Sequence, residues 1–277
     1  MAKGVPMKRR LAFVAGMFNA AEVNGSHYVQ IRPETYATWA AQTPDDFRFA
    51  VKGHRFVTHY KRLRGCADSI ARLRDQAAGL GNKLAAVLWQ LPAHLTAEFA
   101  RLDEFLRDLG RLWGGVPHVI EFRHRSWFTA EVEQRLTDAG VGSCLSDAPD
   151  FPMWEATPTG LVYVRLHGHT RKYASSYARA SLRRWAERAR QWAGEGCEVH
   201  VYFDNDAEGA AIRNGLTLLE ELGQRVAVDP PPSGGRNWRV RPTPSARTAG
   251  ADTGRARSPA GPAGSQNGRS GSVRTGP

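Results

Sequence analysis

Short apolar runs alternate with longer amphipathic stretches along most of this chain. The runs lie at 20–24, 47–54, 84–91, 118–123, 141–147, 161–167 and 198–204. Several of them, such as 84–91, are apolar at nearly every position, which is typical of parallel strands covered on both faces. The pattern therefore predicts seven β-strands.

The stretches between the runs have helical spacing. Apolar residues recur three or four positions apart at Leu95, Phe99, Leu102, Leu106 and Leu109, and similar patterns occupy 5–18, 182–192 and 212–219. Pro33 suits a first helical position and Thr129 suits an N-cap. Strand and helix alternate without interruption, so we predict one α/β domain with a parallel sheet and crossover helices.

Polar side chains recur near the ends of the predicted strands. Residues two apart on a strand share a face. Such pairs are Glu22 and Asn24, Lys52 and His54, Glu121 and Arg123, Arg165 and His167, and Tyr202 and Asp204, while Gln90 and Asp147 stand singly. Because isolated buried charges are costly, we expect these groups to converge on one solvent-filled pocket. The C-terminal mouth of a TIM-barrel-like (β/α) barrel provides such a place.

Two alternatives accompany this interpretation. An open doubly wound sheet would not need polar ends on every strand, and it often carries a glycine-rich phosphate turn that is absent here. The alternating signs of the polar ends also suit an ion-pair lattice that merely closes the barrel. A ligand site and a structural lattice are compatible, and both stay open. His118 and His200 are interpreted as packing residues.

The last part of the chain differs in composition. Residues 233–277 contain eight arginines against Asp252 alone, so they contribute +7 of the net charge of +11 and leave +4 for the rest. We predict a barrel domain at 1–229 and a disordered Pro/Gly/Ser/Arg-rich tail at 230–277. The tail is interpreted as a solvated appendage, with contact to nucleic acid as the alternative.

Other compositional features narrow the class of protein. The apolar fraction of 42% is enough for a core, and no apolar run reaches the roughly 18 residues of a membrane span. Cys66, Cys144 and Cys197 are far apart, without the spacing of a zinc site or a disulfide framework. The start is unlike a signal peptide, so we expect a cytoplasmic protein that does not contact membranes. No motif indicates a metal, nicotinamide, flavin or pyridoxal cofactor.

Several motifs resemble one known family. They are Phe-Arg-Phe-Ala-Val-Lys at 47–52, Leu-Trp-Gln-Leu-Pro at 88–92, Glu-Phe-Arg-His-Arg-Ser-Trp at 121–127, Val-Arg-Leu-His-Gly at 164–168 and Val-Tyr-Phe-Asp-Asn-Asp at 201–206. From about Leu11 to Leu222 the chain resembles domain-of-unknown-function family 72, also called YecE-like. The resemblance implies a TIM-barrel-like fold and no particular chemistry.

The chain departs from the family's pattern in two places. Family members begin with a strand that bears a Gly-x-Ser-Gly-Trp-like motif, whereas this sequence opens with the predicted helix at 5–18. We therefore expect that strand one is missing, through a truncated or misassigned start, which leaves two strands with unpaired edges. Asp204 stands where the family more often has Asn, and it adds a negative charge to the mouth.

The chemistry of the polar ends favours an enzyme acting on an anionic or polyhydroxylated small molecule. Lys52, Arg123 and Arg165 would bind its anionic group. Glu121 or Glu22 would serve as base, with His167 or His54 as the acid. Asn24, Gln90 and Asn205 would orient neutral groups, and Tyr173 would close over the ligand. The other predicted binding residues are Asp147, Tyr202 and Asp204.

Two other functions remain open from the sequence. A divalent-metal hydrolase would use His54, Glu121, Asp147 and His167 as ligands, although no close ligand pair supports it. A non-catalytic binding module would use the arginine tail on nucleic acid, in which case affinity should fall steeply with salt.

Overall fold

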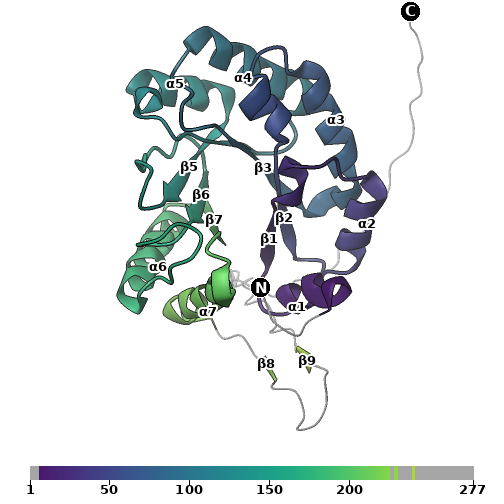
Figure 1. Ribbon diagram of the computed structural model, residues 1–277, viewed down its shortest axis with the longest axis vertical. Helices are drawn as coiled ribbons and strands as arrows, with labels where there is room; N and C mark the ends of the chain where they lie inside the picture. Colours follow the sequence, from purple (N-terminus) through teal and green to yellow (C-terminus); the bar gives the residue numbers. More distant parts are fainter. Residues whose placement is uncertain (1–5, 225–227, 230–238, 241–277) are drawn as a thin grey trace, which may run out of the picture. The chain divides into compact units, whose positions relative to one another are not determined.

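The computed structural model describes residues 6–224, 228–229 and 239–240. Its main sheet has seven parallel strands in chain order: β1 Ala20–Val23, β2 Arg48–Lys52, β3 Leu84–Gln90, β4 His118–Glu121, β5 Gly142–Asp147, β6 Leu161–Leu166 and β7 Glu198–Phe203. Every neighbouring pair from β1 to β7 is parallel, and the sheet curls into a nearly closed barrel (Figure 1). The predicted (β/α) barrel is confirmed, with each strand within two residues of its predicted bounds.

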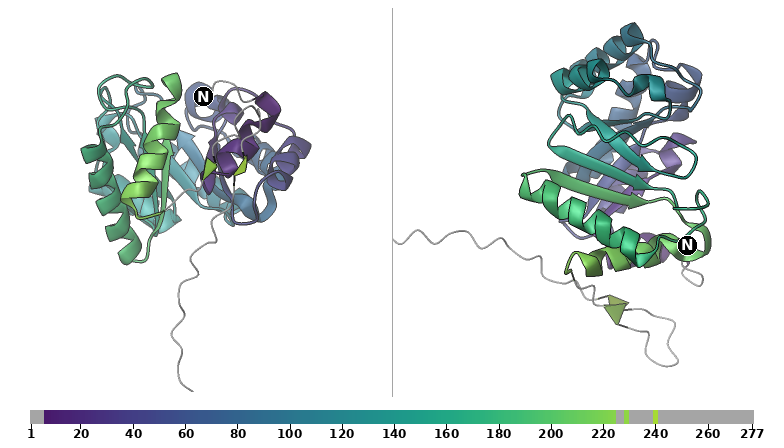
Figure 2. Two further views of the ribbon diagram at one scale, coloured as in Figure 1. Left: turned by 90° about the horizontal axis from the view of Figure 1, so that it is seen from below. Right: turned by 90° about the vertical axis from the view of Figure 1, so that its left-hand side faces the viewer.

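Helices cover the outside of the strands (Figure 2). They are α1 Arg10–Ala15, α2 Pro33–Ala41, α3 Ala67–Ala77, α4 Phe99–Trp113, α5 Ala130–Ala139, α6 Arg179–Gly194 and α7 Ala210–Glu221. Pro33 opens α2, and the Thr129 hydroxyl caps α5 by accepting from the Val132 amide. Both local predictions are therefore confirmed.

Short helical turns lie in the connections. They are the 3₁₀ turns η1 Met7–Arg9, η2 Gly25–His27, η4 Ala78–Lys83, η5 Arg125–Trp127 and η6 Ala207–Gly209, and the π-helix η3 Phe56–Tyr60. A separate antiparallel pair joins β8 Val228–Asp229 to β9 Arg239–Val240. Apart from Arg239–Val240, the tail predicted at 230–277 lies outside the described residues, so its disorder stays a prediction.

The link from β5 to β6 breaks the predicted alternation of strand and helix. Residues 148–160 form an irregular loop, because Pro149, Pro152 and Pro158 remove backbone donors that a helix would need. Trp154 anchors this loop by stacking on Phe128, with ring centroids 5.4 Å apart. The loop thereby passes beside the segment that follows β4 before the chain returns to the start of β6.

The sheet is buried on both faces, as the apolar runs predicted. Outward side chains such as Val51, Trp89 and Ile120 pack against the helices. Inward side chains form a smaller core inside the barrel, made of Ala50, Ala86, Leu88, Val119, Cys144, Leu161, Tyr163 and Tyr202. This inner core fills the barrel from below, so inward residues nearer the strand ends form the next layer up.

No helix of the described part of the chain has the length and apolar character needed to cross a membrane.

Candidate functional site at the barrel mouth

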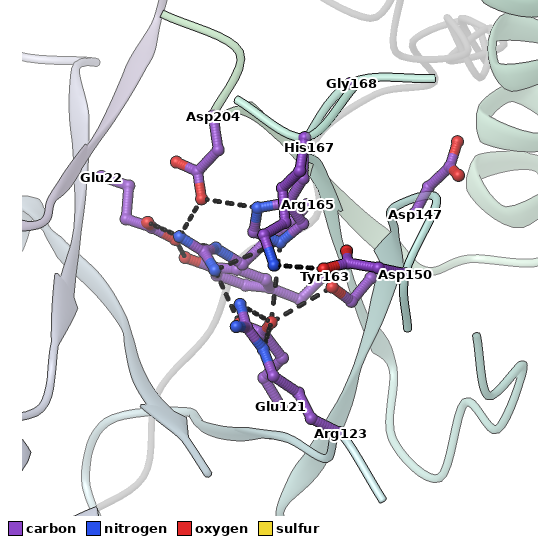
Figure 3. Close-up of polar contacts among 12 residues, drawn as sticks. Glu22, Glu121, Arg123, Asp147, Asp150, Tyr163, Arg165, His167, Gly168 and Asp204 are labelled. Atoms are coloured by element: carbon purple, nitrogen blue, oxygen red, sulfur yellow. Dashed lines mark hydrogen bonds and ion pairs between the residues drawn. The ribbon is translucent and has the colours of Figure 1, made fainter. Parts of the chain in front are cut away.

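Arg165 lies at the centre of the layer above the inner core (Figure 3). Its side chain is only 1% exposed and contacts carboxylates from three other strands. The Glu22 oxygens accept from its Nε and Nη2 at 3.0 and 2.8 Å. Glu121 accepts from Nη1 at 2.6 Å, and Asp204 forms an ion pair with Nη2. One guanidinium therefore ties β1, β4 and the end of β7 to β6.

Two buried carboxylates of this layer, those of Glu121 and Asp204, are held ionised. Burial alone would raise the pKa of Glu121, but Arg123 and Arg165 outweigh it and hold that pKa well below its ordinary value. Burial also raises the pKa of Asp204, but Arg165 and His167 outweigh burial and bring that pKa down to about 2. The carboxylates in turn raise the pKa of Arg165 against its burial. Glu121, Asp204 and Arg165 are therefore charged and paired at neutral pH.

His167 lies between two of these carboxylates. Its Nδ1 is 3.2 Å from Oδ2 of Asp204, and its Nε2 is 3.6 Å from Oε1 of Glu121. Burial lowers the pKa of His167, but hydrogen bonding to Asp204 and Glu121 outweighs burial and raises the pKa above its ordinary value. The site therefore stabilises the charged form of the His167 imidazole.

Glu121 has further partners on neighbouring strands. Its Oε1 accepts from Nε of Arg123 at 2.8 Å and from the Ser146 hydroxyl at 3.1 Å. The Arg123 guanidinium also lies 4.1 Å from the centroid of the Phe151 ring, and the Lys172 ammonium lies 4.4 Å from that ring. The irregular β5–β6 loop thus supplies an aromatic ring between two cations beside the cluster.

Glu22 is held from below by Tyr163. The Tyr163 hydroxyl donates to Oε2 of Glu22 at 2.6 Å. Asn24 lies above it, where its Nδ2 is 3.4 Å from Asp204 and its Oδ1 is 3.5 Å from Nη2 of Arg165. Both carboxylate oxygens of Glu22 therefore accept hydrogen bonds: Oε2 from Tyr163 and Arg165, and Oε1 from Arg165.

The Lys52 ammonium differs from the other charges of this layer. Lys52 points inward from the end of β2 and is only 6% exposed. Its ammonium makes no hydrogen bond or ion pair with any residue of the described ranges. Burial, together with the positive charge of Arg165, lowers the pKa of Lys52 although Glu121, Glu22 and Asp204 raise it. The inward Gln90 side chain, on the next strand, is buried and likewise has no hydrogen-bond partner in that part of the chain.

Seven of the predicted residues therefore lie in one layer or at its upper edge. They are Glu22, Asn24, Glu121, Arg123, Arg165, His167 and Asp204, and Lys52 and Gln90 complete the inward ring. The central side chains are almost completely buried, with Glu121 and His167 at 0%. We predicted a solvent-filled hollow at this centre, but the long Arg165 side chain occupies it.

Asp147 and Asn205 are placed elsewhere, which corrects the prediction. Ser146 pairs in register with Arg165 and faces inward, so Asp147 faces the opposite side of β5 (Figure 3). Asn205, one residue after the inward Asp204, is buried against Asn214 and the Ser175 carbonyl. Both errors come from the period of two along a strand, since a shift of one residue reverses the face.

His54 is also outside the cluster, because β2 ends at Lys52. The chain turns into η3 after that residue, and Nδ1 of His54 accepts from the Phe56 amide. Tyr202 does face inward, but one layer lower, where its ring packs on Tyr163 and its hydroxyl contacts His200. Neither side chain has an interaction with Arg165.

Tyr173 does lie over the cluster, as predicted for a closing residue. Its ring is 5.6 Å from that of His167, and its amide donates to the His167 carbonyl at 2.5 Å. Tyr173 adopts a left-handed φ of 62° and is 44% exposed. His118 packs as predicted, buried between Trp89 and the Trp113 carbonyl.

Sequence reasoning missed three residues of the site: Tyr163, Ser146 and Phe151. Tyr163 lies two positions before Arg165, and Ser146 lies two positions after the inward Cys144. The spacing that selected the other polar residues would have found both. Phe151 lies in a loop, so no periodic signal marks it.

The metal alternative requires residues that the structure separates. Glu121 and His167 are adjacent, but Asp147 points away from them (Figure 3), and His54 lies beyond the end of β2, where it accepts from the Phe56 amide. Among the described residues, no group of three or more His, Cys, Asp or Glu side chains is arranged to hold a metal ion.

Two cavities lie away from the cluster. One of about 450 Å³ lies between α4 and α5, beside Arg107 and Arg135. The other, of about 230 Å³, lies among η2, η3 and α3 and is lined by residues that include His54, Phe56 and Arg72. Neither is the mouth pocket that the sequence predicted.

The family model described as "Protein of unknown function DUF72" matches residues 2–236. The chain belongs to the DUF72 family. Among curated relatives, UPF0759 protein YunF of Bacillus subtilis is 26% identical over 246 residues, which cover 78% of this chain and 87% of YunF. UPF0759 protein YecE of Escherichia coli is 30% identical over 125 residues, 45% of each chain.

Solved DUF72 structures share the fold. A DUF72 family protein of Thermotoga maritima superposes with a TM-score of 0.69 at 25% identity, covering 81% of this chain and 91% of its own. A DUF72 family protein of Enterococcus faecalis gives a TM-score of 0.70 at 20% identity, over 78% and 89% of the two chains. The barrel expected from the resemblance is thus confirmed.

Proposed function

We propose that this DUF72 protein binds a small anionic molecule at Lys52 and carries out proton-transfer chemistry on it at the barrel mouth. The observation that carries the proposal is Lys52, whose side chain is only 6% exposed and whose ammonium has no hydrogen bond or ion pair within the described residues. A cation that is largely removed from water and has no hydrogen-bond partner is unfavourable. An anionic ligand would supply the missing charge-assisted hydrogen bonds.

The charge balance of the layer supports an anion. Three carboxylates, Glu22, Glu121 and Asp204, face three basic side chains, Lys52, Arg123 and Arg165. Protonated His167 adds one further positive charge. All three carboxylates pair with Arg165, whereas Lys52 pairs with none of them, so Lys52 is the basic group of this layer that is open to an anion.

The paired carboxylates are poor candidates for the base. Glu121 accepts from Arg123, Ser146 and Arg165, and its pKa is held low. A general base needs a free lone pair and a pKa near the working pH. We infer that Glu22 and Glu121 hold Arg165 and His167 in place. We infer that His167 is the proton donor and that Asp204, which contacts its Nδ1, supports it. Tyr173 would need to move aside for a ligand to reach His167.

Calorimetric titration tests the binding half of this proposal. The ligands are inorganic phosphate and ribose phosphate, and the variant is Lys52→Met, with Lys8→Met in η1 as the charge-matched control on an exposed residue. We expect saturable binding to the unmodified protein and to Lys8→Met, and at least about tenfold weaker binding to Lys52→Met. Equal binding by Lys52→Met, or no binding by the unmodified protein, would overturn the assignment.

The catalytic half needs a separate readout. A mixture of phosphorylated sugars and carboxylic acids is incubated with the protein and followed by phosphorus and proton NMR. We expect a time-dependent change that the His167→Gln variant loses while it retains phosphate binding. If His167→Gln converts the ligand at the same rate as the unmodified protein, His167 has no part in the chemistry. If the unmodified protein converts none of the compounds, the mouth is a binding site without catalysis.

A further inference from the structure

Three large aromatic side chains are exposed on the loops that follow β1 and β2. Tyr28 is 60% exposed, Phe56 45% and Tyr60 65%. The Arg55 guanidinium lies 5.7 Å from the ring centroids of both Tyr28 and Tyr60. We call these four residues the aromatic rim. Exposed aromatic side chains gathered with a cation indicate a binding surface more often than an accident of packing.

Hydrogen bonds attach the aromatic rim to the end of β2. The Ser26 hydroxyl donates to the Lys52 carbonyl at 2.7 Å, and Nδ1 of His27 is 2.8 Å from the Gly53 carbonyl. The loop that carries Tyr28 is therefore fixed beside the residue that bears the unpaired ammonium. Figure 1 shows β1 and β2 side by side, each leading to its own loop and helix.

Two histidines lie between the aromatic rim and Lys52. The His27 ring contacts the rings of Tyr28 and His59, with centroids 5.0 and 5.1 Å apart. Burial, with a contribution from Lys52, lowers the pKa of both histidines, that of His27 to about 4. Both imidazoles are therefore neutral near pH 7, and the buried His27 ring links Tyr28 to the end of β2.

The two segments that carry the aromatic rim are basic in sequence, although Arg64 of the second segment pairs with Glu98 of the next connection. The segment 53–66 contains four Lys or Arg residues and two His residues, and neither it nor 24–31 contains Asp or Glu. Basic charge interleaved with exposed rings is the pattern by which proteins hold phosphate-linked planar bases. Phe56–Tyr60 forms a π-helix, which is a rare structure. Such turns are frequent at functional sites, so the π-helix is consistent with a functional segment.

The cavity of about 230 Å³ adjoins the aromatic rim through Phe56. Its lining includes the neutral hydrogen-bonding side chains Gln30, Ser69 and Gln76. It is smaller than the roughly 300–1,000 Å³ of a site for a whole drug-sized ligand. A site of this size next to exposed rings suits one part of a ligand, such as the polar edge of a heterocycle.

We propose that the anion bound at Lys52 is the phosphate of a nucleotide unit, whose base stacks on the aromatic rim. This inference rests on the proposed function, because it uses the same ammonium, and it adds the chemical class of the ligand. The same chemistry occurs in a free nucleotide and in one residue of a single strand. Ring stacking and phosphate neutralisation would each contribute to affinity, so neither half of the ligand should bind as well alone.

Binding of four probes to the full chain tests the inference. Adenosine monophosphate, ribose phosphate and adenosine are titrated by calorimetry, and a short labelled oligothymidylate is titrated by fluorescence anisotropy. We expect adenosine monophosphate to bind about tenfold or more tightly than ribose phosphate or adenosine. An oligothymidylate that binds more tightly still, by an amount that Tyr28→Ala/Tyr60→Ala removes, would identify the single strand as the source.

Matched variants separate stacking from charge. Tyr28→Ala/Tyr60→Ala should weaken the binding of adenosine monophosphate about tenfold and leave the affinity for ribose phosphate unchanged. Tyr28→Phe/Tyr60→Phe retains the rings and should bind both ligands with normal affinity. Arg55→Ala should weaken the binding of adenosine monophosphate, whereas Arg107→Ala, on the exposed side of α4, should not change it.

The two proposals fail in distinguishable ways. If ribose phosphate binds at Lys52 as tightly as adenosine monophosphate, and the Tyr28→Ala/Tyr60→Ala variant binds both normally, the nucleotide inference is wrong and the anion site stands. If adenosine binds as tightly as its monophosphate and Lys52→Met changes nothing, the anion site is wrong. Absence of binding by all four probes would overturn both.

Discussion

Arg165 and Glu22 are 143 residues apart in the chain and form a two-point contact, with N–O distances of 3.0 and 2.8 Å. The contact matters because β1 and β7 are the two ends of the strand order, and no backbone pairing joins them in the described sheet. Side chains take over that role. Arg165 and Tyr163 reach Glu22 on β1, and Asn24 reaches Asp204 beyond β7.

Arg165→Met should destabilise the fold strongly. The variant leaves three buried carboxylates without their shared cation, and breaking a buried pair in this way typically costs about 3–5 kcal/mol. Urea unfolding measures the change. Arg111→Met, which removes an exposed pair with Asp108, should cost less than about 1 kcal/mol. Equal small effects of both variants would contradict the central role of Arg165.

Lys52→Met should behave in the opposite way to Arg165→Met. Since the Lys52 side chain is largely buried and its ammonium has no hydrogen bond or ion pair within the described residues, its replacement by an apolar side chain should leave the free energy of unfolding unchanged or raise it by about 1 kcal/mol. Urea unfolding in ligand-free buffer gives the value. A loss of more than about 2 kcal/mol would show that Lys52 has a structural partner.

The pKa of His167 predicts a pH dependence of stability. Its folded-state pKa is raised above the unfolded value of about 6.5, so charged His167 stabilises the fold fully below that pH. The contribution is lost as the pH rises through the raised pKa. The unfolding free energies of the unmodified protein and His167→Gln should therefore converge on going from mildly acidic to alkaline pH, because the other histidines are common to both. A difference that grows with pH would contradict the assignment.

Asp204→Asn should lower the pKa of His167. Burial lowers this pKa, and the contact with Asp204 is the first of the effects that oppose burial. With a neutral amide at position 204, the imidazole keeps only Glu121 as an anionic neighbour. Proton NMR titration of the His167 ring gives the pKa directly. Asp150→Asn, on an exposed pair with Lys172, is the control that should leave it unchanged.

Gly53→Ala should disrupt the end of β2. A Cβ at this position would lie 2.2 Å from a ring atom of Trp89, which is buried and cannot move aside. Overpacking of this kind costs about 1–3 kcal/mol or more. Gly110→Ala in α4 meets no atom within 4 Å and should instead stabilise the helix by about 0.5–1 kcal/mol. Similar effects of both substitutions in thermal unfolding would contradict this account.

The local sequence was sufficient to predict the strands, because nearly continuous apolar runs such as 84–91 have few alternatives to a strand covered on both faces. It also placed Pro33 and Thr129 correctly, since both act on their own helix. The repeated i, i+2 spacing located most of the mouth cluster. It did so because the barrel brings inward residues at the ends of successive strands to one layer.

Where a strand ends, and which side chains fill the space between strands, was decided by the tertiary structure. Asp147 and Asn205 lie on outer faces because register fixes the inward residue on each strand, and a run of polar residues does not show it. The predicted hollow is filled by Arg165, whose length lets it reach carboxylates on three other strands at once. Sequence supplied the charges. Only the closed geometry determined which of them pair and left the Lys52 ammonium without a partner.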